Sequence, residues 1–160
     1  MDRDLARKIL DSGIDVIAFS LAGTDPATNA VRKGADFDRV CRSIATLQKI
    51  RRARNGVHLE VHFAYLMLAS AIEAVRGLPA LAKELGVHAV VVSTLDYIPA
   101  PDFEPEAFGV HETGKLAEAA GVLSETGAEA KALGVDFHWS LPRADAPGDQ
   151  CREDIARSFY

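Results

Sequence analysis

The chain has 160 residues, of which 48% are hydrophobic and 26% are charged, and its formal net charge is -5 at pH 7. This length provides one domain with a sizeable core, and the acidic balance argues against nucleic-acid binding, which needs clustered Lys and Arg. No apolar run approaches the roughly 20 residues that span a bilayer, so we expect no membrane insertion. Residues 1–4 lack the pattern of a signal peptide, and two cysteines cannot form a disulfide framework. We therefore expect a cytoplasmic protein with reduced thiols.

The predicted elements alternate between helix and strand, because apolar spacings of three and four give way repeatedly to short apolar runs. In chain order they are helix 2–12, strand 14–20, helix 37–54, strand 58–67, helix 71–85, strand 88–96, helix 112–133 and strand 135–141. Pro79 should kink the third helix or divide it into two pieces. The proline-rich segment 99–105 predicts an extended loop. This order predicts parallel strands joined by right-handed crossovers.

The second helix carries two features with a structural interpretation. Cys41 falls on its apolar face, so we expect a core residue rather than a reactive thiol. Four basic residues close the helix, where positive charge complements the helix dipole better than it indicates nucleic-acid binding. They are Lys49, Arg51, Arg52 and Arg54.

Three helix-to-strand junctions share one pattern, in which a glycine ends the helix and a serine ends the following strand. The glycines are Gly13, Gly86 and Gly134, and the serines are Ser20, Ser93 and Ser140. Glycine accepts the left-handed conformation that ends many helices. Ligands of barrels and open α/β sheets bind at the carboxyl ends of the strands, so the serines are candidate ligand contacts. The alternative is a purely structural hydrogen bond at the end of each strand.

The strand at 58–67 alternates cleanly between two kinds of side chain. Leu59, Val61, Phe63, Tyr65 and Met67 share one face, and His58, Glu60, His62, Ala64 and Leu66 share the other. Strands of a doubly wound sheet are apolar on both faces, whereas a barrel wall can be apolar outward and polar inward. The sequence therefore predicts an α/β fold, an incomplete parallel (β/α) barrel of about four strands with alternating helices. In that fold Glu60 and His62 face the lumen; the alternative is exposure on an edge strand.

The segment 10–24 (LDSGIDVIAFSLAGT) resembles the fourth barrel strand and following loop of radical S-adenosylmethionine enzymes. The segments 29–37 (NAVRKGADF) and 81–86 (LAKELG) continue the similarity, which covers most of residues 3–98. The segment 147–160 (PGDQCREDIARSFY) resembles the entry to a SPASM domain, the cysteine-rich extension of one branch of that family. The resemblance divides the chain into a partial barrel over 1–143 and the start of a truncated SPASM-like segment over 144–160.

The resemblance implies a six-stranded partial barrel in which a 4Fe-4S cluster cleaves S-adenosylmethionine to a carbon radical that abstracts hydrogen from a substrate. It implies that Ser20 contacts the ribose or methionine part of this cofactor and that Arg32 pairs with the methionine carboxylate. Glu60, His62 and Ser93 would line the lumen. Cys151 would be a metal ligand to an auxiliary cluster.

The sequence also departs from the family. It lacks the CxxxCxxC loop that holds the catalytic cluster and the Gly-Gly-Glu segment after the second strand, and Ala22 stands where many relatives have Asp. Residue 1 falls just after the expected third strand. We therefore expect no catalysis by this chain alone and a partner in the missing N-terminal barrel half or another subunit, acting on an unknown small-molecule or peptide substrate. Two alternatives are a non-catalytic small-ligand or interaction module and a half-barrel that dimerises.

Overall fold

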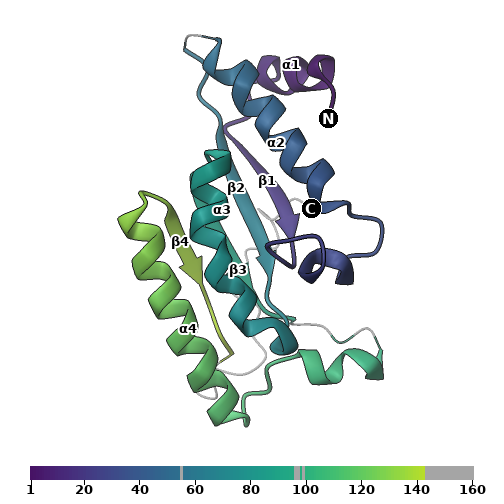
Figure 1. Cartoon of the computed structure of the whole chain (residues 1–160), viewed down its shortest axis with the longest axis vertical. Coiled ribbons are helices and arrows are strands. Elements are labelled where there is room, and N and C mark those ends of the chain that lie inside the picture. Colours follow the sequence, from purple (N-terminus) through teal and green to yellow (C-terminus); the bar gives the residue numbers. More distant parts are fainter. Residues whose placement is uncertain (55, 96–97, 99, 143–160) are drawn as a thin grey trace, which may run out of the picture.

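The computed structural model describes residues 1–54, 56–95, 98 and 100–142 (Figure 1). Its elements in chain order are α1 (Arg3–Asp11), β1 (Val16–Leu21), the 3-10 helix η1 (Thr28–Val31), α2 (Phe37–Arg52), β2 (Glu60–Leu66), the 3-10 helix η2 (Ala69–Gly77), α3 (Leu78–Leu85), β3 (Ala89–Ser93), the 3-10 helix η3 (Pro101–Glu106), α4 (Thr113–Ala132) and β4 (Asp136–Trp139). The predicted alternation of helix and strand is therefore confirmed, although the strands predicted at 88–96 and 135–141 are shorter and the helix predicted at 71–85 is not one α-helix.

The prolines account for two details of this arrangement. Pro79 stands in the first turn of α3, where its missing N–H costs nothing, and the predicted third helix is accordingly divided into η2 and α3. The extended loop predicted at 99–105 was wrong over residues 101–105, which belong to the 3-10 helix η3; residue 99 lies outside the described residues. Proline's fixed φ is compatible with a helical first turn as well as with an extended chain.

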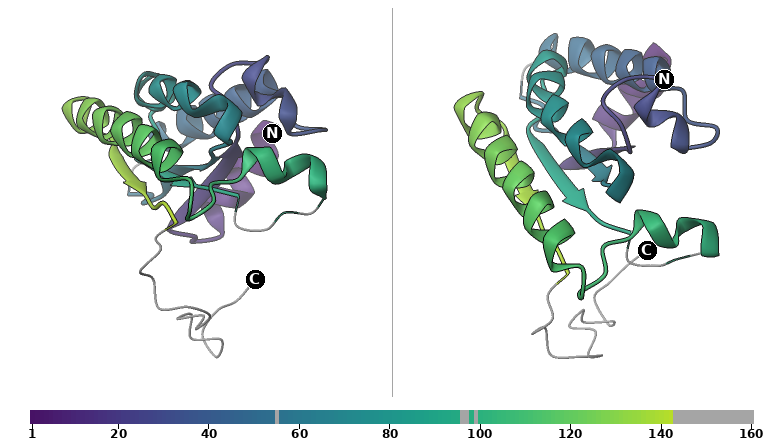
Figure 2. Two further views of the ribbon diagram at one scale, coloured as in Figure 1. Left: turned by 90° about the horizontal axis from the view of Figure 1, so that it is seen from below. Right: turned by 60° about the horizontal axis from the view of Figure 1, so that its bottom comes forward.

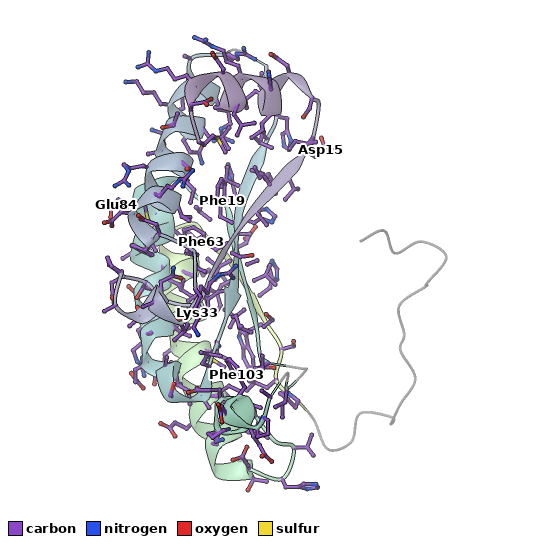
Figure 3. The ribbon with its side chains drawn as sticks, turned by 90° about the vertical axis from the view of Figure 1, so that its right-hand side faces the viewer. Asp15, Phe19, Lys33, Phe63, Glu84 and Phe103 are labelled. Atoms are coloured by element: carbon purple, nitrogen blue, oxygen red, sulfur yellow. The ribbon has the colours of Figure 1, made fainter. Side chains whose placement is uncertain are left out.

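The four strands form one parallel sheet in the order β1-β2-β3-β4. Helices α2, α3 and α4 cover one face of this sheet, and α1 packs on α2 (Figure 3). Figure 2 shows α4 running along β4 at one edge of the sheet. A doubly wound fold would reverse its strand order and place helices on both faces. The predicted α/β fold, an incomplete parallel (β/α) barrel, is therefore confirmed.

The core lies between the sheet and its helices. Phe63 of β2 is fully buried there, and Figure 3 places Phe19 of β1 on the same side. The predicted apolar face of the second strand is confirmed, because its members are all buried: Leu59, Val61, Phe63, Tyr65 and Met67. Burying such a side chain contributes roughly 1.5–3 kcal/mol, so this face holds the sheet against the helix layer.

Glycines end three of the helices as predicted. Gly13, Gly86 and Gly134 have φ values of 74°, 67° and 74°, a region that other residues rarely adopt. Each glycine turns the chain out of its helix toward the strand that follows. Among the described residues, no helix has the length and apolar composition needed to cross a bilayer.

Candidate functional site

The sheet face opposite α2, α3 and α4 carries no helix within the described part of the chain (Figure 3). The strand register arranges its residues in rows across the sheet. The first row is Val16 and Glu60; the second is Ala18, His62, Ala89 and Asp136; the third is Ser20, Ala64, Val91 and His138; the fourth begins with Leu66 and Ser93. Successive rows are roughly 6.7 Å apart and neighbouring strands about 4.8 Å. We call this surface the open face.

Glu60 and His62 form a hydrogen-bonded pair on the open face. The Glu60 Oε2 atom lies 2.9 Å from His62 Nε2, and the side chains are 42% and 22% exposed. Residues two apart on a strand share a face, which allows this contact. The hydrogen bond from His62 lowers the pKa of the Glu60 carboxyl, so the carboxylate is ionised at neutral pH.

The pair lies in the amino-terminal half of the sheet. Glu60 is the first residue of β2, whereas ligands of such folds bind at the carboxyl ends. From the register, Glu60 is about 14 Å from Ser20 and His62 about 8 Å. The structure therefore brings His62 nearer to the strand-end serines than Glu60.

Ser20 and Ser93 share the open face near its carboxyl edge, and both are exposed. The Ser93 hydroxyl lies 3.4 Å from the carbonyl oxygen of Tyr65, a long contact, and Ser20 has no side-chain hydrogen bond within the described residues. One row and two strands separate the serines, which corresponds to about 12 Å. A ligand of the size of a nucleoside could contact both.

Arg32 is placed differently from the other predicted contacts. It follows η1 in the loop after β1 rather than lying on a strand, and Figure 3 shows its neighbour Lys33 on the helix side of the sheet. Its Nε atom is buried and has no hydrogen-bond partner among the described residues. Buried donors without partners are uncommon, so this atom has capacity for an acceptor.

The loop after β1 is built by short side chains that bind its backbone. Asp25 Oδ1 accepts from the N–H groups of Ala27 and Thr28, at 2.8 and 2.9 Å, and the Thr28 contact lowers the pKa of Asp25. Asn29 is 1% exposed, and its Oδ1 accepts from the N–H of Ala22 at 2.9 Å. These contacts give the carboxyl end of β1 a defined shape. The predicted site omitted them, although an Asp followed three residues later by Thr is a recognisable turn signal.

Tyr65 was also absent from the predicted site. Its ring belongs to the core at the level of Leu21, but its hydroxyl is buried without a partner among the described residues, as is Asn29 Nδ2. Burial raises the pKa of Tyr65 to about 12, so the hydroxyl remains protonated. The alternation along the strand predicted only a core position for Tyr65. Alternation counts a tyrosine as an apolar residue in the same way as a phenylalanine, so it carries no information about the hydroxyl.

Cysteine contributes little to the described part of the molecule. Cys41 is half-buried on α2, and burial, followed by the negative charges of Asp38 and Glu84, raises the pKa of its thiol. The expected core position was wrong, because Cys41 lies at the margin of the helix layer and is not part of the buried core. Cys151 and the whole segment 144–160 lie outside the described residues. No group of three His, Cys, Asp or Glu side chains in the described ranges could hold a metal ion.

The described side chains can be compared with the two groups that the family resemblance implies, an iron-sulfur cluster and S-adenosylmethionine. An iron-sulfur cluster takes four thiolates, and Cys41 is the one thiol described, so these residues do not fit a cluster and no step is derived through it. S-adenosylmethionine needs hydroxyl and cationic partners, which Ser20, Ser93 and Arg32 supply in chemical type. The described residues therefore fit the organic cofactor in part.

No protein-family model and no curated protein matches this sequence. The similarity of residues 10–24 to radical S-adenosylmethionine enzymes therefore remains a prediction from local sequence. The fold rests on the observed sheet, independently of that similarity.

Proposed function

We propose that this chain is the later part of a radical S-adenosylmethionine/SPASM-type enzyme and supplies four strands of its barrel wall. The observation that carries the proposal is the open face, a parallel sheet with helices on one side and a mixture of small, polar and exposed apolar residues on the other. Such a face suits a lumen better than bulk water, because Val16 and Val91 are 48% and 44% exposed on it. The chain is not competent alone, since CxxxCxxC is absent from its sequence.

In this proposal the missing strands come from the N-terminal barrel half or another subunit and pair with the free edge of β1. Unpaired strand edges present a row of free N–H and C=O groups, so an added parallel strand satisfies them. Ser20 would contact the ribose or methionine part of the cofactor, Ser93 would line the same lumen, and Arg32 would pair with the methionine carboxylate. The bound cofactor would supply the carbon radical. We place the protein in the cytoplasm, where Cys41 and Cys151 would remain reduced.

Calorimetric titration of the full chain with S-adenosylmethionine tests the cofactor contact. We expect weak, saturable binding that Ser20→Ala weakens about twofold to tenfold, the worth of one hydrogen bond. Ser124→Ala, which removes an exposed hydroxyl on α4, is the matched control and should leave binding unchanged. Absence of saturable binding, or equal losses in both variants, would contradict retained cofactor contacts.

The coding DNA on either side of this segment tests the parentage. A CxxxCxxC motif upstream and further cysteines downstream are expected. A reading frame without either would leave the open face as a non-catalytic ligand or interaction surface.

A half-barrel that dimerises is a second candidate, favoured by the chain-order sheet with β1 and β4 at its two edges. A two-fold axis along the barrel would place β4 of each copy parallel to β1 of the other and close the wall. Sedimentation at increasing concentration distinguishes the two, because a stable dimer supports closure between copies. A strict monomer would leave the first proposal.

A further inference from the structure

The second row of the open face places a histidine between two methyl groups. His62 stands between Ala18 on β1 and Ala89 on β3, and Asp136 ends the same row on β4. The flanking alanines carry only methyl groups, and Ala89 is itself 5% exposed. His62 is 22% exposed, less than a free surface side chain.

The partner of His62 determines which of its ring nitrogens can accept a proton. The ionised Glu60 carboxylate is an acceptor only, so the hydrogen of the 2.9 Å contact must lie on His62 Nε2. In a neutral imidazole the other nitrogen, Nδ1, then carries the free lone pair. Within the described residues His62 makes no further hydrogen bond, so Nδ1 is available to a ligand.

The charges near His62 determine which hydrogen-bond donors can bind there. Glu60 is negative, because the hydrogen bond from His62 lowers the pKa of its carboxyl. Asp136 stands two strands away in the same row, whereas Glu60 is hydrogen-bonded to His62 itself. Glu60 therefore dominates near His62. It repels carboxylates and phosphates and attracts an ammonium group.

We propose that His62, held by Glu60, is a hydrogen-bond acceptor at the floor of the lumen. The substrate of the complete barrel places a primary ammonium group there, which donates to His62 Nδ1. This inference rests on the proposed function for the closed lumen, but not on the identity of its cofactor. Glu60 is a positioning residue in it, since it acts through the imidazole.

The full chain allows a direct test by nuclear magnetic resonance at about pH 8, where an ordinary imidazole is neutral. Long-range ¹H–¹⁵N spectra should show hydrogen on His62 Nε2 and a free Nδ1. Titration with methylammonium should shift the Nδ1 resonance and the methyl signals of Ala18 and Ala89 to saturation. Tetramethylammonium, a cation without an N–H donor, and acetate should leave them unchanged.

Variants separate the two roles in this pair. His62→Phe should abolish the methylammonium shifts at both alanines, and Glu60→Gln should weaken binding roughly twofold to fivefold. His138→Gln, which changes a histidine on the same face, is the matched control and should bind as the unmodified chain does. Hydrogen on Nδ1, no saturable shift, or an equal response to tetramethylammonium would overturn the inference. Because S-adenosylmethionine takes no part, this failure is distinct from failure of the calorimetric test.

Discussion

Gly23 shows how one residue controls the loop that follows β1. A Cβ atom at this position would lie 2.2 Å from the backbone nitrogen of Asn29, far inside any real contact. The loop closes this tightly because Asn29 reaches back to the N–H of Ala22. Glycine is needed here for space rather than for a left-handed φ.

Gly23→Ala should therefore destabilise the protein by about 1–3 kcal/mol or more, the usual cost of forced overpacking. Gly114→Ala in α4 is the matched control, because a Cβ there meets nothing within 4 Å. That control should stabilise by up to roughly 1 kcal/mol through helix propensity. Urea denaturation followed by circular dichroism measures both, and equal stabilities of the two variants would contradict the steric account.

His88 is a second residue whose role depends on its surroundings. Its Nδ1 accepts from the N–H of Val61 at 3.0 Å, and its Nε2 lies 3.1 Å from Arg51 Nη1. Burial, followed by the Arg51 charge, lowers the pKa of His88. Protonation would remove the acceptor that Val61 uses.

Stability should accordingly fall on acidification through the range in which His88 titrates. The unfolded chain, with an ordinary His pKa of about 6.5, binds protons more readily than the folded one. The contribution of His88 is thus complete above that value, declines as the pH drops below it, and levels off below the folded-state pKa. His88→Asn keeps an acceptor for Val61 and should flatten this part of the profile. Urea midpoints between about pH 8 and 5 provide the measurement; identical profiles for both proteins would contradict it.

At the scale of single elements, local signals predicted most boundaries. The apolar spacing of α2 and its acidic N-cap were both legible, and Asp36 does accept from the N–H of Arg39 at 2.8 Å. The glycines of α4 opposed a helix by propensity, yet Thr113–Ala132 is one helix. Packing explains the exception at Gly127, where an added Cβ would lie 3.4 Å from the Phe137 ring. Because Gly127 has no side chain, α4 can approach β4 closely at this point.

Removing the N-cap of α2 tests the local account of this helix. Asp36→Ala should cost about 1 kcal/mol, since it leaves the N–H of Arg39 without its acceptor. Asp38→Ala removes a carboxylate from the same first turn that makes no capping bond, and it should cost only a few tenths of a kcal/mol. Thermal unfolding of the two variants separates capping from simple charge.

For the whole molecule, the decisive feature is that helices cover only one face of the sheet. Val90 is fully buried against the helix layer, whereas its neighbour Val91 is 44% exposed on the open face. Both residues are valines on β3, so their intrinsic strand propensity is the same. They differ in the layer that each one faces.

Val90→Thr should destabilise the chain by about 1–3 kcal/mol, because it buries a hydroxyl among apolar side chains. Val91→Thr should change stability by less than roughly 0.5 kcal/mol in the isolated chain. The comparison uses chemical denaturation of dilute protein. A large loss in Val91→Thr would indicate that the open face is covered in solution, and a dilution series would then show whether a second copy covers it.

The sequence by itself determined the order of the elements, the parallel sheet and the two faces of β2, because a side-chain period of two or of three to four is a local property. Tertiary structure decided which residues share a row. Register depends on the lengths of the connecting loops and on how the helices pack, and neither is visible in a pattern. For that reason Glu60 and His62 could be assigned to one face beforehand, and Ser20 and Ser93 were expected near a ligand only from their strand-end positions and the family resemblance. The alanines beside His62, the amino-edge position of Glu60 and the separate placement of Arg32 emerged only in three dimensions.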